Sequence, residues 1–227
     1  MILSVVATPI GNLGDISLRA KEVLSHASLI VAEDTRTTGK LLKMLGIERE
    51  HSYASFHAQT SPQAILGLIN ACAEHEHIAL VTDAGTPGIS DPGCVFVSAF
   101  KKQYPDASVV PIPGASALIS ALSVSGYPAS HFEFLGFLPH KKGKQTLMRK
   151  MAETNHTLVF YESPHRIMKT LGEFGEHIGD RDVFIAREIT KLHESYTHNT
   201  CTGHKEYFEA QPEKCRGEFV CVVSPKK

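Results

Sequence analysis

Short apolar runs alternate with amphipathic segments along the first half of the chain. Runs rich in Val, Ile, Leu and Ala predict buried strands at residues 3–7, 29–33, 77–82 and 108–111. Apolar residues within 20–27 and 65–72 recur at the spacing of one helix face. The second helix is expected to begin after Ser61, a good N-cap residue followed by Pro62. Strands alternating with helices are typical of helices packed on a mostly parallel sheet, so we expect an α/β fold.

A cluster of small residues and proline interrupts this pattern at residues 123–130. It separates a predicted helix at 116–122 from an aromatic run at 132–137. The alternation then restarts, with predicted helices near 145–153 and from 165, and predicted strands at 157–161, 183–187 and 219–223. We therefore predict two α/β domains, residues 1–126 and 127–227.

The composition describes a globular chain with a sizeable core. Hydrophobic residues make up 42% and charged residues 21% of the 227 positions, which argues against disorder. The formal net charge is -1, so any polyanion must bind a local patch instead of an overall basic field. Five cysteines without a Cys-x-x-Cys pair suggest neither a disulfide framework nor a cysteine-rich zinc site, which fits a reducing cytoplasm.

The apolar N-terminus is interpreted as a first strand. It lacks the basic region of a signal peptide and runs directly into a segment at 11–14 that begins and ends with glycine. No apolar stretch approaches the ~20 residues that a membrane helix needs. We therefore expect a cytoplasmic protein with no membrane partner.

Residues with binding chemistry gather directly after the predicted strands, where ligands bind in open α/β sheets. These segments are 8–15, 33–36, 83–93, 111–117, 162–166 and 188–191. Their glycines and prolines permit close approach of the backbone to a ligand. None matches the Walker A sequence or the Gly-x-Gly-x-x-Gly of dinucleotide-binding folds, which disfavours a nucleoside triphosphate or NAD.

Eight segments along nearly the whole chain carry a family resemblance. They are VATPIGNLGDISLRA (6–20), AEDTRTTGKLL (32–42), LVTDAGTPGISDPG (80–93), VVPIPGASALISALSVSG (109–126), GFLPHKKGK (136–144), LVFYESPHR (158–166), AREITKLHE (186–194) and GEFVCVV (217–223). In order and spacing they resemble the ribosomal RNA small subunit methyltransferase I family, within the tetrapyrrole-methylase-like class of S-adenosylmethionine (SAM) enzymes.

The resemblance implies a fold, an activity and an assembly. The implied fold is tetrapyrrole-methylase-like, with two α/β domains and a SAM-binding cleft between them. The implied reaction is methyl transfer to the ribose 2′-hydroxyl of a cytidine in the decoding region of small-subunit (16S) rRNA. The expected partners are small-subunit rRNA or the assembled ribosomal subunit, and a second copy of the chain in a homodimer.

The resemblance also assigns residues to the cofactor. The implied SAM contacts are Pro9, Ile10, Asp83, Ala84, Gly85, Thr86, Gly88, Ile89, Ser116, Ala117, Tyr161, Ala186, Arg187, Gly217 and Glu218. Backbone groups and small side chains would hold the adenosine and methionine parts against apolar walls. Core packing is the alternative role of Ile10, Ile89 and Ala117. Asp83 is harder to assign to packing, because a buried carboxylate without a partner is costly.

Methyl transfer from a sulfonium is an in-line displacement, so the protein mainly aligns the reacting atoms and excludes water. A sugar hydroxyl is a weak nucleophile, and a general base within hydrogen-bond reach should help. Asp34 is the first candidate base and Glu33 the second, since both follow a strand. A salt bridge with Arg36, itself a candidate site residue, is the alternative role of Asp34. Glu188 is a third candidate, paired with one of two nearby cations, Lys191 or Arg187.

RNA contacts are expected from a local cationic surface. The predicted phosphate contacts are Arg36, Lys141, Lys142, Lys144 and Arg166. Such contacts give sequence-independent, salt-sensitive binding, although a run of lysines is also typical of a solvated surface. An unpaired base could stack on Phe137, Tyr53 or Phe56, with core packing the expected role of Phe137.

Two departures from the family pattern bear on RNA binding. Residues 57–61 read His-Ala-Gln-Thr-Ser where the family usually has a His-x-His-Asn-Glu run, and the sequence ends at Lys227 without the small C-terminal module of many members. We therefore expect RNA affinity to be weaker or to be assisted by a partner surface.

Two other functions are compatible with the same fold. One alternative is a tetrapyrrole methyltransferase acting on a porphyrin or corrin precursor. The other is a non-catalytic RNA-binding or ribosome-assembly module on the same fold. The histidines form neither a His-Glu-x-x-His motif nor a Cys/His quartet, so no metal site is predicted.

Overall fold

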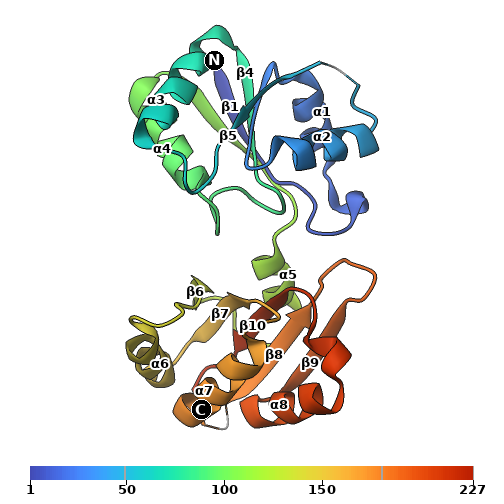
Figure 1. The fold of residues 1–227 in the computed structure, drawn as a ribbon, viewed down its shortest axis with the longest axis vertical. Helices are drawn as coiled ribbons and strands as arrows, with labels where there is room; N and C mark the ends of the chain where they lie inside the picture. Colours follow the sequence, from blue (N-terminus) through green and yellow to red (C-terminus); the bar gives the residue numbers. More distant parts are fainter. Residues whose placement is uncertain (49, 180, 227) are drawn as a thin grey trace. The chain divides into compact units, whose positions relative to one another are not determined.

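The computed structural model describes residues 1–48, 50–179 and 181–226, which form two compact units (Figure 1). The first unit ends at Ser116 and the second begins at Ala117. The boundary expected after Gly126 is therefore too late. The helix α5 (Ala117–Val124) packs on two strands of the second unit and buries Leu118 and Ala121, so its contacts assign it to that unit.

The first unit is built on a five-stranded parallel sheet. The strands are β1 (Ile2–Val6), β2 (Leu29–Ala32), β3 (Ser52–Ser55), β4 (His77–Val81) and β5 (Ser108–Ile112), in the order β3-β2-β4-β1-β5. All pairs are parallel, as the alternation predicts. The β2 strand is buried at all four positions because helices cover both faces of the sheet.

The helices of the first unit begin at side-chain caps where the sequence supplies them. They are α1 (Leu18–His26), α2 (Thr35–Met44), α3 (Pro62–Ala71) and α4 (Gly93–Gln103), with short 3₁₀ turns at Leu13–Asp15 and Cys72–Glu74. The Ser61 hydroxyl accepts a hydrogen bond from Ala64 N at 3.2 Å, which confirms the predicted start of α3. The apolar pattern does not predict α2 and α4. In α2, Thr and Gly obscure the helical signal.

The second unit is built on a mixed five-stranded sheet. The strands are β6 (Phe132–Phe137), β7 (Thr157–Glu162), β8 (Asp182–Arg187), β9 (Ser195–Thr200) and β10 (Phe219–Val223), in the order β6-β7-β10-β8-β9. The β10 strand is antiparallel to both of its neighbours, whereas β6 and β7 are parallel. The antiparallel pairing was not foreseen, because the apolar pattern carries no strand direction.

Helices complete the second unit around an aromatic core. Besides α5 they are α6 (Lys144–Glu153), α7 (Ile167–Ile178) and α8 (Cys201–Ala210), with a 3₁₀ turn at Pro212–Cys215. Phe160, Phe174, Phe208 and Phe219 are all buried in this core. Within the part of the chain that the structure describes, no helix combines the length and the apolar character needed to cross a membrane.

Candidate functional site

In the first unit, hydrogen bonds join the loops that follow β1, β4 and β5. The backbone N–H of Thr8 donates to the Gly85 carbonyl at 2.9 Å, and the N–H of Gly85 donates to the Thr8 carbonyl at 3.1 Å. The Thr86 hydroxyl donates to the Ala115 carbonyl at 3.1 Å. Three loops that are distant in sequence therefore meet at the carboxyl edge of the sheet, as the strand-end rule predicts.

The loop 83–93, which we call the glycine loop, is shaped by glycine at position 85 and by the carboxylate of Asp91. Gly85 has φ +83°, and a Cβ there would lie 3.3 Å from Ile10 Cγ2. The Asp91 carboxylate accepts hydrogen bonds from Gly88 N at 2.8 Å and Gly93 N at 2.7 Å, and this fixes the second half of the loop. The predicted cofactor residues Asp83, Ala84 and Ile89 are left exposed on it.

Three carboxyl groups lie where β2 and β4 end. The Thr82 hydroxyl donates to Glu33 Oε2 at 2.7 Å, and Asp34 N donates to Asp83 Oδ1 at 3.1 Å. Desolvation raises the pKa of Asp83. The hydrogen bond from Asp34 N opposes this rise, and the charges of Glu33 and Asp34 reinforce it. The predicted candidates from two separate loops are thus brought together.

Asp34 is the N-cap of α2 and forms an ion pair with Arg36. Its Oδ1 accepts from Arg36 N at 2.8 Å and from Arg36 Nε at 3.2 Å, and its Oδ2 accepts from an Arg36 terminal nitrogen at 2.9 Å. The hydrogen bond from the Arg36 side chain lowers the pKa of Asp34 to about 2. The salt bridge weighed as an alternative is therefore confirmed, while the Arg36 side chain remains 86% exposed.

In the second unit, several predicted cofactor residues share neighbouring strands. Val220 of β10 pairs with Tyr161 of β7 on one side and with Ala186 of β8 on the other. Burial raises the pKa of Tyr161, and a backbone hydrogen bond with Leu118 opposes the rise. This bond places the first turn of α5, which begins at Ala117, beside the Tyr161 hydroxyl. Ala186 and Val220 are buried, whereas Tyr161 is partly exposed.

The Arg187 side chain forms hydrogen bonds within the second unit. Its guanidinium is buried and donates to the carbonyls of Arg216 at 2.5 Å and His193 at 2.8 Å. These bonds join the loop after β8 to the entry of β10. Arg187 thus stabilises two loops through its side chain, and its contact with SAM stays a prediction.

Glu188 also holds the β8 and β10 loops together. Its Oε1 accepts from Lys191 Nζ at 2.9 Å and from Glu218 N at 2.8 Å. Burial raises the pKa of Glu188, but the Glu218 backbone N–H and the Lys191 ammonium outweigh it, and the net shift is downward. At Gly217, φ is +95° and any Cβ would overlap Glu188 Cγ. Of the two cations considered as partners of Glu188, Lys191 forms the ion pair, and the Glu188 carboxylate is engaged in local structure.

The predicted RNA contacts divide into exposed and buried cations. Lys141 and Lys142 are exposed. Lys144 is 7% exposed and its ammonium contacts the Glu173 carboxylate. The Arg166 guanidinium donates to the Leu138 carbonyl at 2.6 Å and lies 3.3 Å from a Glu162 oxygen. The expectation that Lys144 and Arg166 contact phosphate is corrected, because both cations are already paired inside the unit.

The aromatic residues also depart from expectation. Phe56 is buried in the core of the first unit, so it offers no face to a base. Tyr53 on the edge strand β3 is 42% exposed. Phe137, for which core packing was expected, is 57% exposed at the end of the edge strand β6.

Glu162 is a structural carboxylate that the sequence analysis did not select. Its side chain is fully buried; Oε1 accepts from Ser163 N at 2.8 Å, and Oε2 accepts from the Thr170 hydroxyl at 2.7 Å. Together with Arg166 it links the end of β7 to the start of α7. The signal available in the sequence is an acid at a strand end, four residues before an arginine.

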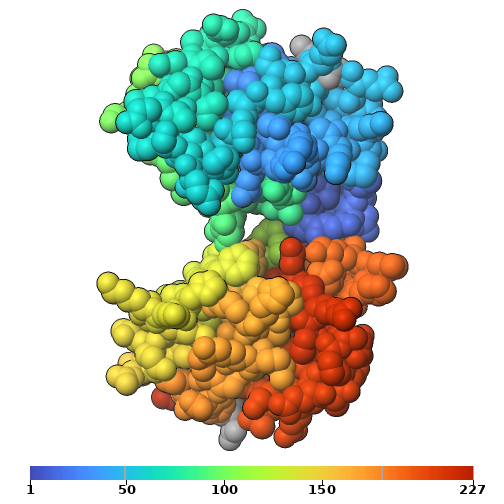
Figure 2. Space-filling model, viewed as in Figure 1, coloured from blue at the N-terminus to red at the C-terminus, as the bar shows by residue number. Residues whose placement is uncertain are grey.

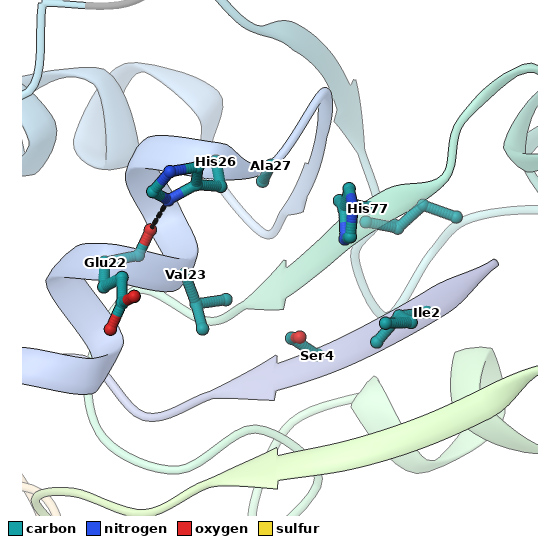
Figure 3. Close-up of a pocket in the computed structure, with 8 residues that line it drawn as sticks. Ile2, Ser4, Glu22, Val23, His26, Ala27 and His77 are labelled. Atoms are coloured by element: carbon teal, nitrogen blue, oxygen red, sulfur yellow. Dashed lines mark hydrogen bonds between the residues drawn. The ribbon is translucent and has the colours of Figure 1, made fainter.

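A separate cavity of about 310 Å³ lies against α1 and the first residues of β1 and β4 (Figure 3). Ile2, Ser4, Val23 and His77 are among its lining residues, and His26 Nδ1 donates to the Glu22 carbonyl at 2.8 Å beside it. None of the predicted site residues lines this cavity. It lies at the amino ends of the strands and is not part of the candidate site.

The comparisons with known proteins agree with this architecture. A family model described as Tetrapyrrole (Corrin/Porphyrin) Methylases matches residues 3–202. The chain is 42% identical over 225 residues to the Ribosomal RNA small subunit methyltransferase I of Thermotoga maritima, covering 99% of each chain.

Two solved structures illustrate the fold likeness. Diphthine synthase is similar with a TM-score of 0.75 and 13% identity, covering 100% of this chain and 91% of that one. Uroporphyrin-III C-methyl transferase from Thermus thermophilus, complexed with S-adenyl homocysteine, is similar with a TM-score of 0.64 and 16% identity, covering 98% of this chain and 96% of that one.

Proposed function

The chain belongs to the tetrapyrrole (corrin/porphyrin) methylase family, and from this premise we propose that it is a SAM-dependent rRNA methyltransferase acting on the small ribosomal subunit. The predicted family and fold class are confirmed. The substrate assignment rests on the 42% sequence identity, over 99% of each chain, to a protein named for small-subunit rRNA methylation. The proposed acceptor is the ribose 2′-hydroxyl of a cytidine in the decoding region.

The residues at the carboxyl edge of the first sheet fit SAM. The backbone at Gly85 occupies a conformation and a space that a side chain would disturb, and its N–H and carbonyl are both bonded to Thr8, so Gly85 shapes the loop that exposes Asp83 and Ala84. Exposed Asp83 offers carboxylate oxygens to the amino or hydroxyl groups of a ligand. When bound, SAM supplies an electrophilic methyl group. In the second unit, the partly exposed Tyr161 is proposed to contribute its ring and phenol to the contact with SAM.

We propose Asp34 as the carboxylate that accepts a hydrogen bond from the acceptor hydroxyl. Its Oδ2 accepts one bond, from Arg36, and a carboxylate oxygen can accept a second. Arg36 holds the carboxylate in a fixed orientation, which favours alignment of a nucleophile. With a pKa of about 2, Asp34 is ionised at physiological pH and acts better as an orienting acceptor than as a strong base.

An rRNA substrate also implies contacts with phosphates, and we propose which residues make them. Exposed Lys141, Lys142 and Arg36 would contact phosphates of rRNA or of the assembled subunit. A homodimer would present this cationic surface twice, and two linked contacts bind a polyanion more tightly than one. Ribosomal subunits are cytoplasmic, and we propose the same location for this protein.

The proposed function is tested with purified protein and isotopically labelled SAM. Small ribosomal subunits from a strain lacking the gene, the naked rRNA and uroporphyrinogen III are offered in parallel. Label is expected in the rRNA of the first or second reaction and not in the macrocycle. Label only in the macrocycle would favour the tetrapyrrole alternative, which the uroporphyrin-III C-methyl transferase likeness motivates. Binding of rRNA without any SAM affinity would favour the non-catalytic assembly module.

Replacing Asp34 by alanine is expected to lower kcat while leaving the SAM dissociation constant nearly unchanged. The carboxylate is proposed to contact the acceptor hydroxyl and not the cofactor, and loss of a positioned acceptor typically reduces the rate by ~10²-fold or more. Because the pKa of Asp34 is about 2, the wild-type rate should show no inflection from this group between pH 5 and 9. Single-turnover kinetics and calorimetric titration measure the two quantities.

Asp34→Asn is the matched variant for this prediction. The amide oxygen can still cap α2 through Arg36 N, so the fold should be retained while the charge is lost. If Asp34→Ala turns over at the wild-type rate, Asp34 has no part in the reaction. An equal loss in Ala and Asn variants assigns the effect to the charge, and a loss in alanine alone assigns it to the cap.

A further inference from the structure

The edge strand β6 is irregular just before its last residue. In its parallel pairing with β7, Phe134 lies opposite Val159 but Phe137 lies opposite Tyr161, so three steps along β6 match two along β7. Gly136 has φ +59° at this bulge. A bulge changes the direction in which the following side chain points. Phe137 accordingly ends 57% exposed instead of entering the core.

The Phe137 ring is nevertheless held in place. Its centroid lies 5.6 Å from that of Tyr161, with the ring planes at 61°. The Tyr161 ring also contacts Phe134 at 5.0 Å, in an edge arrangement. An edge contact of this kind supports one side of an aromatic ring. The combination of a fixed ring and an open surface suits stacking with a planar ligand.

The segment after Phe137 is held in place by the buried ion pair of Glu162 and Arg166. Arg166, paired with Glu162, donates to the Leu138 carbonyl at 2.6 Å and lies 3.4 Å from His140 Nε2. The chain then continues directly into exposed Lys141 and Lys142. Figure 1 shows this connection between β6 and α6 at one edge of the second unit, and Figure 2 shows its yellow atoms on the surface.

We propose that Phe137, Lys141 and Lys142 form a nucleotide-binding surface, on which one unpaired RNA base stacks on Phe137 while the two lysines contact nearby phosphates. The inference rests on the proposed function and names a specific part of its RNA interface. Phe137 and Lys141 are four positions apart in the chain, which limits their backbone separation to ~14 Å. An aromatic ring beside cations is how proteins bind unpaired nucleotides without reading every base.

Replacing Phe137 by leucine should weaken RNA binding while preserving SAM binding. Loss of one base stack is expected to raise the dissociation constant of a decoding-region RNA fragment roughly 5- to 100-fold in filter binding. With small subunits as substrate, KM should rise more than kcat falls. Phe137→Tyr keeps the ring and should restore binding close to that of the wild type. The SAM dissociation constant, measured by calorimetry, should not change.

Matched variants separate a local surface from general effects. Tyr196→Leu removes another exposed aromatic residue, on β9, and should leave RNA binding unchanged. Lys141→Gln/Lys142→Gln should lower affinity and reduce its salt dependence. Lys101→Gln/Lys102→Gln removes two exposed lysines at the end of α4 and should do neither.

Several results would overturn the inference. They are wild-type affinity in Phe137→Leu, equal loss in Phe137→Leu and Phe137→Tyr, or a parallel loss of SAM affinity. Failure of the proposed function is distinguishable, because a wild-type protein that methylates no rRNA fails in the activity assay, whereas filter binding still tests the surface directly.

Discussion

Gly85→Ala is expected to lower SAM affinity by roughly tenfold or more. A shift of the loop that costs ~1.4 kcal/mol of binding free energy is enough for a tenfold loss. The backbone at this position has φ +83°, and an added Cβ would lie 3.3 Å from Ile10 Cγ2. A left-handed conformation costs a non-glycine residue roughly 1–2 kcal/mol. The loop can relieve this strain only by moving, and its hydrogen bonds with Thr8 would then shift the loop after β1. Calorimetric titration with SAM measures the change.

Gly46→Ala is the matched control for this prediction. Gly46 has φ +71°, but an added Cβ there meets nothing within 4 Å. It should therefore lose similar stability, measured by thermal unfolding, with no loss of SAM affinity. The glycine loop would cease to be the cofactor loop if both variants lost affinity equally, or if Gly85→Ala bound SAM as well as the wild type.

Glu162→Gln is expected to destabilise the protein by roughly 3–5 kcal/mol, because removing one partner of a buried ion pair leaves the other charge uncompensated. The Glu162 side chain is fully buried and the Arg166 side chain is 16% exposed. Glutamine keeps the volume and can still accept from Thr170, so the change isolates the charge. Urea unfolding of the full chain, followed by far-UV circular dichroism, measures the loss.

A double variant tests the physical reason for this loss. In Glu162→Gln/Arg166→Met, no unpaired charge remains, and stability should recover part of the difference. Glu209→Gln, which removes an exposed partner of Lys205, should change stability little. If Glu162→Gln were as mild as Glu209→Gln, the buried pair would not be holding β7 and α7 together.

The sequence was most informative where burial leaves a strong pattern. The β2 strand is apolar at all four positions and was predicted, whereas the polar edge strands β3 and β9 were not. An edge strand has one neighbour and solvent beside it, so its composition is under weaker constraint. The domain boundary was placed too late because small residues mark a flexible connection, while packing of α5 on β7 and β10 decides where the unit begins.

The candidate site was predictable where topology alone decides proximity. Glu33, Asp34 and Asp83 follow strands that are neighbours in the sheet, and the strand-end rule brings them together. The cations were not predictable in this way. Lys141 and Lys144 look alike in sequence, but Glu173, on a later helix, takes up the ammonium of Lys144. Likewise, the exposure of Phe137 depends on a bulge at Gly136 that apolar periodicity does not reveal.

We propose that this chain methylates small-subunit rRNA on a ribose. The most direct test is mass-spectrometric mapping of ribose methylation in that rRNA from a strain in which the gene is deleted and from the same strain carrying the gene again. We predict that one cytidine in the decoding region loses its 2′-O-methyl group on deletion and regains it on complementation. Unchanged ribose methylation in the deletion strain would contradict the proposed activity.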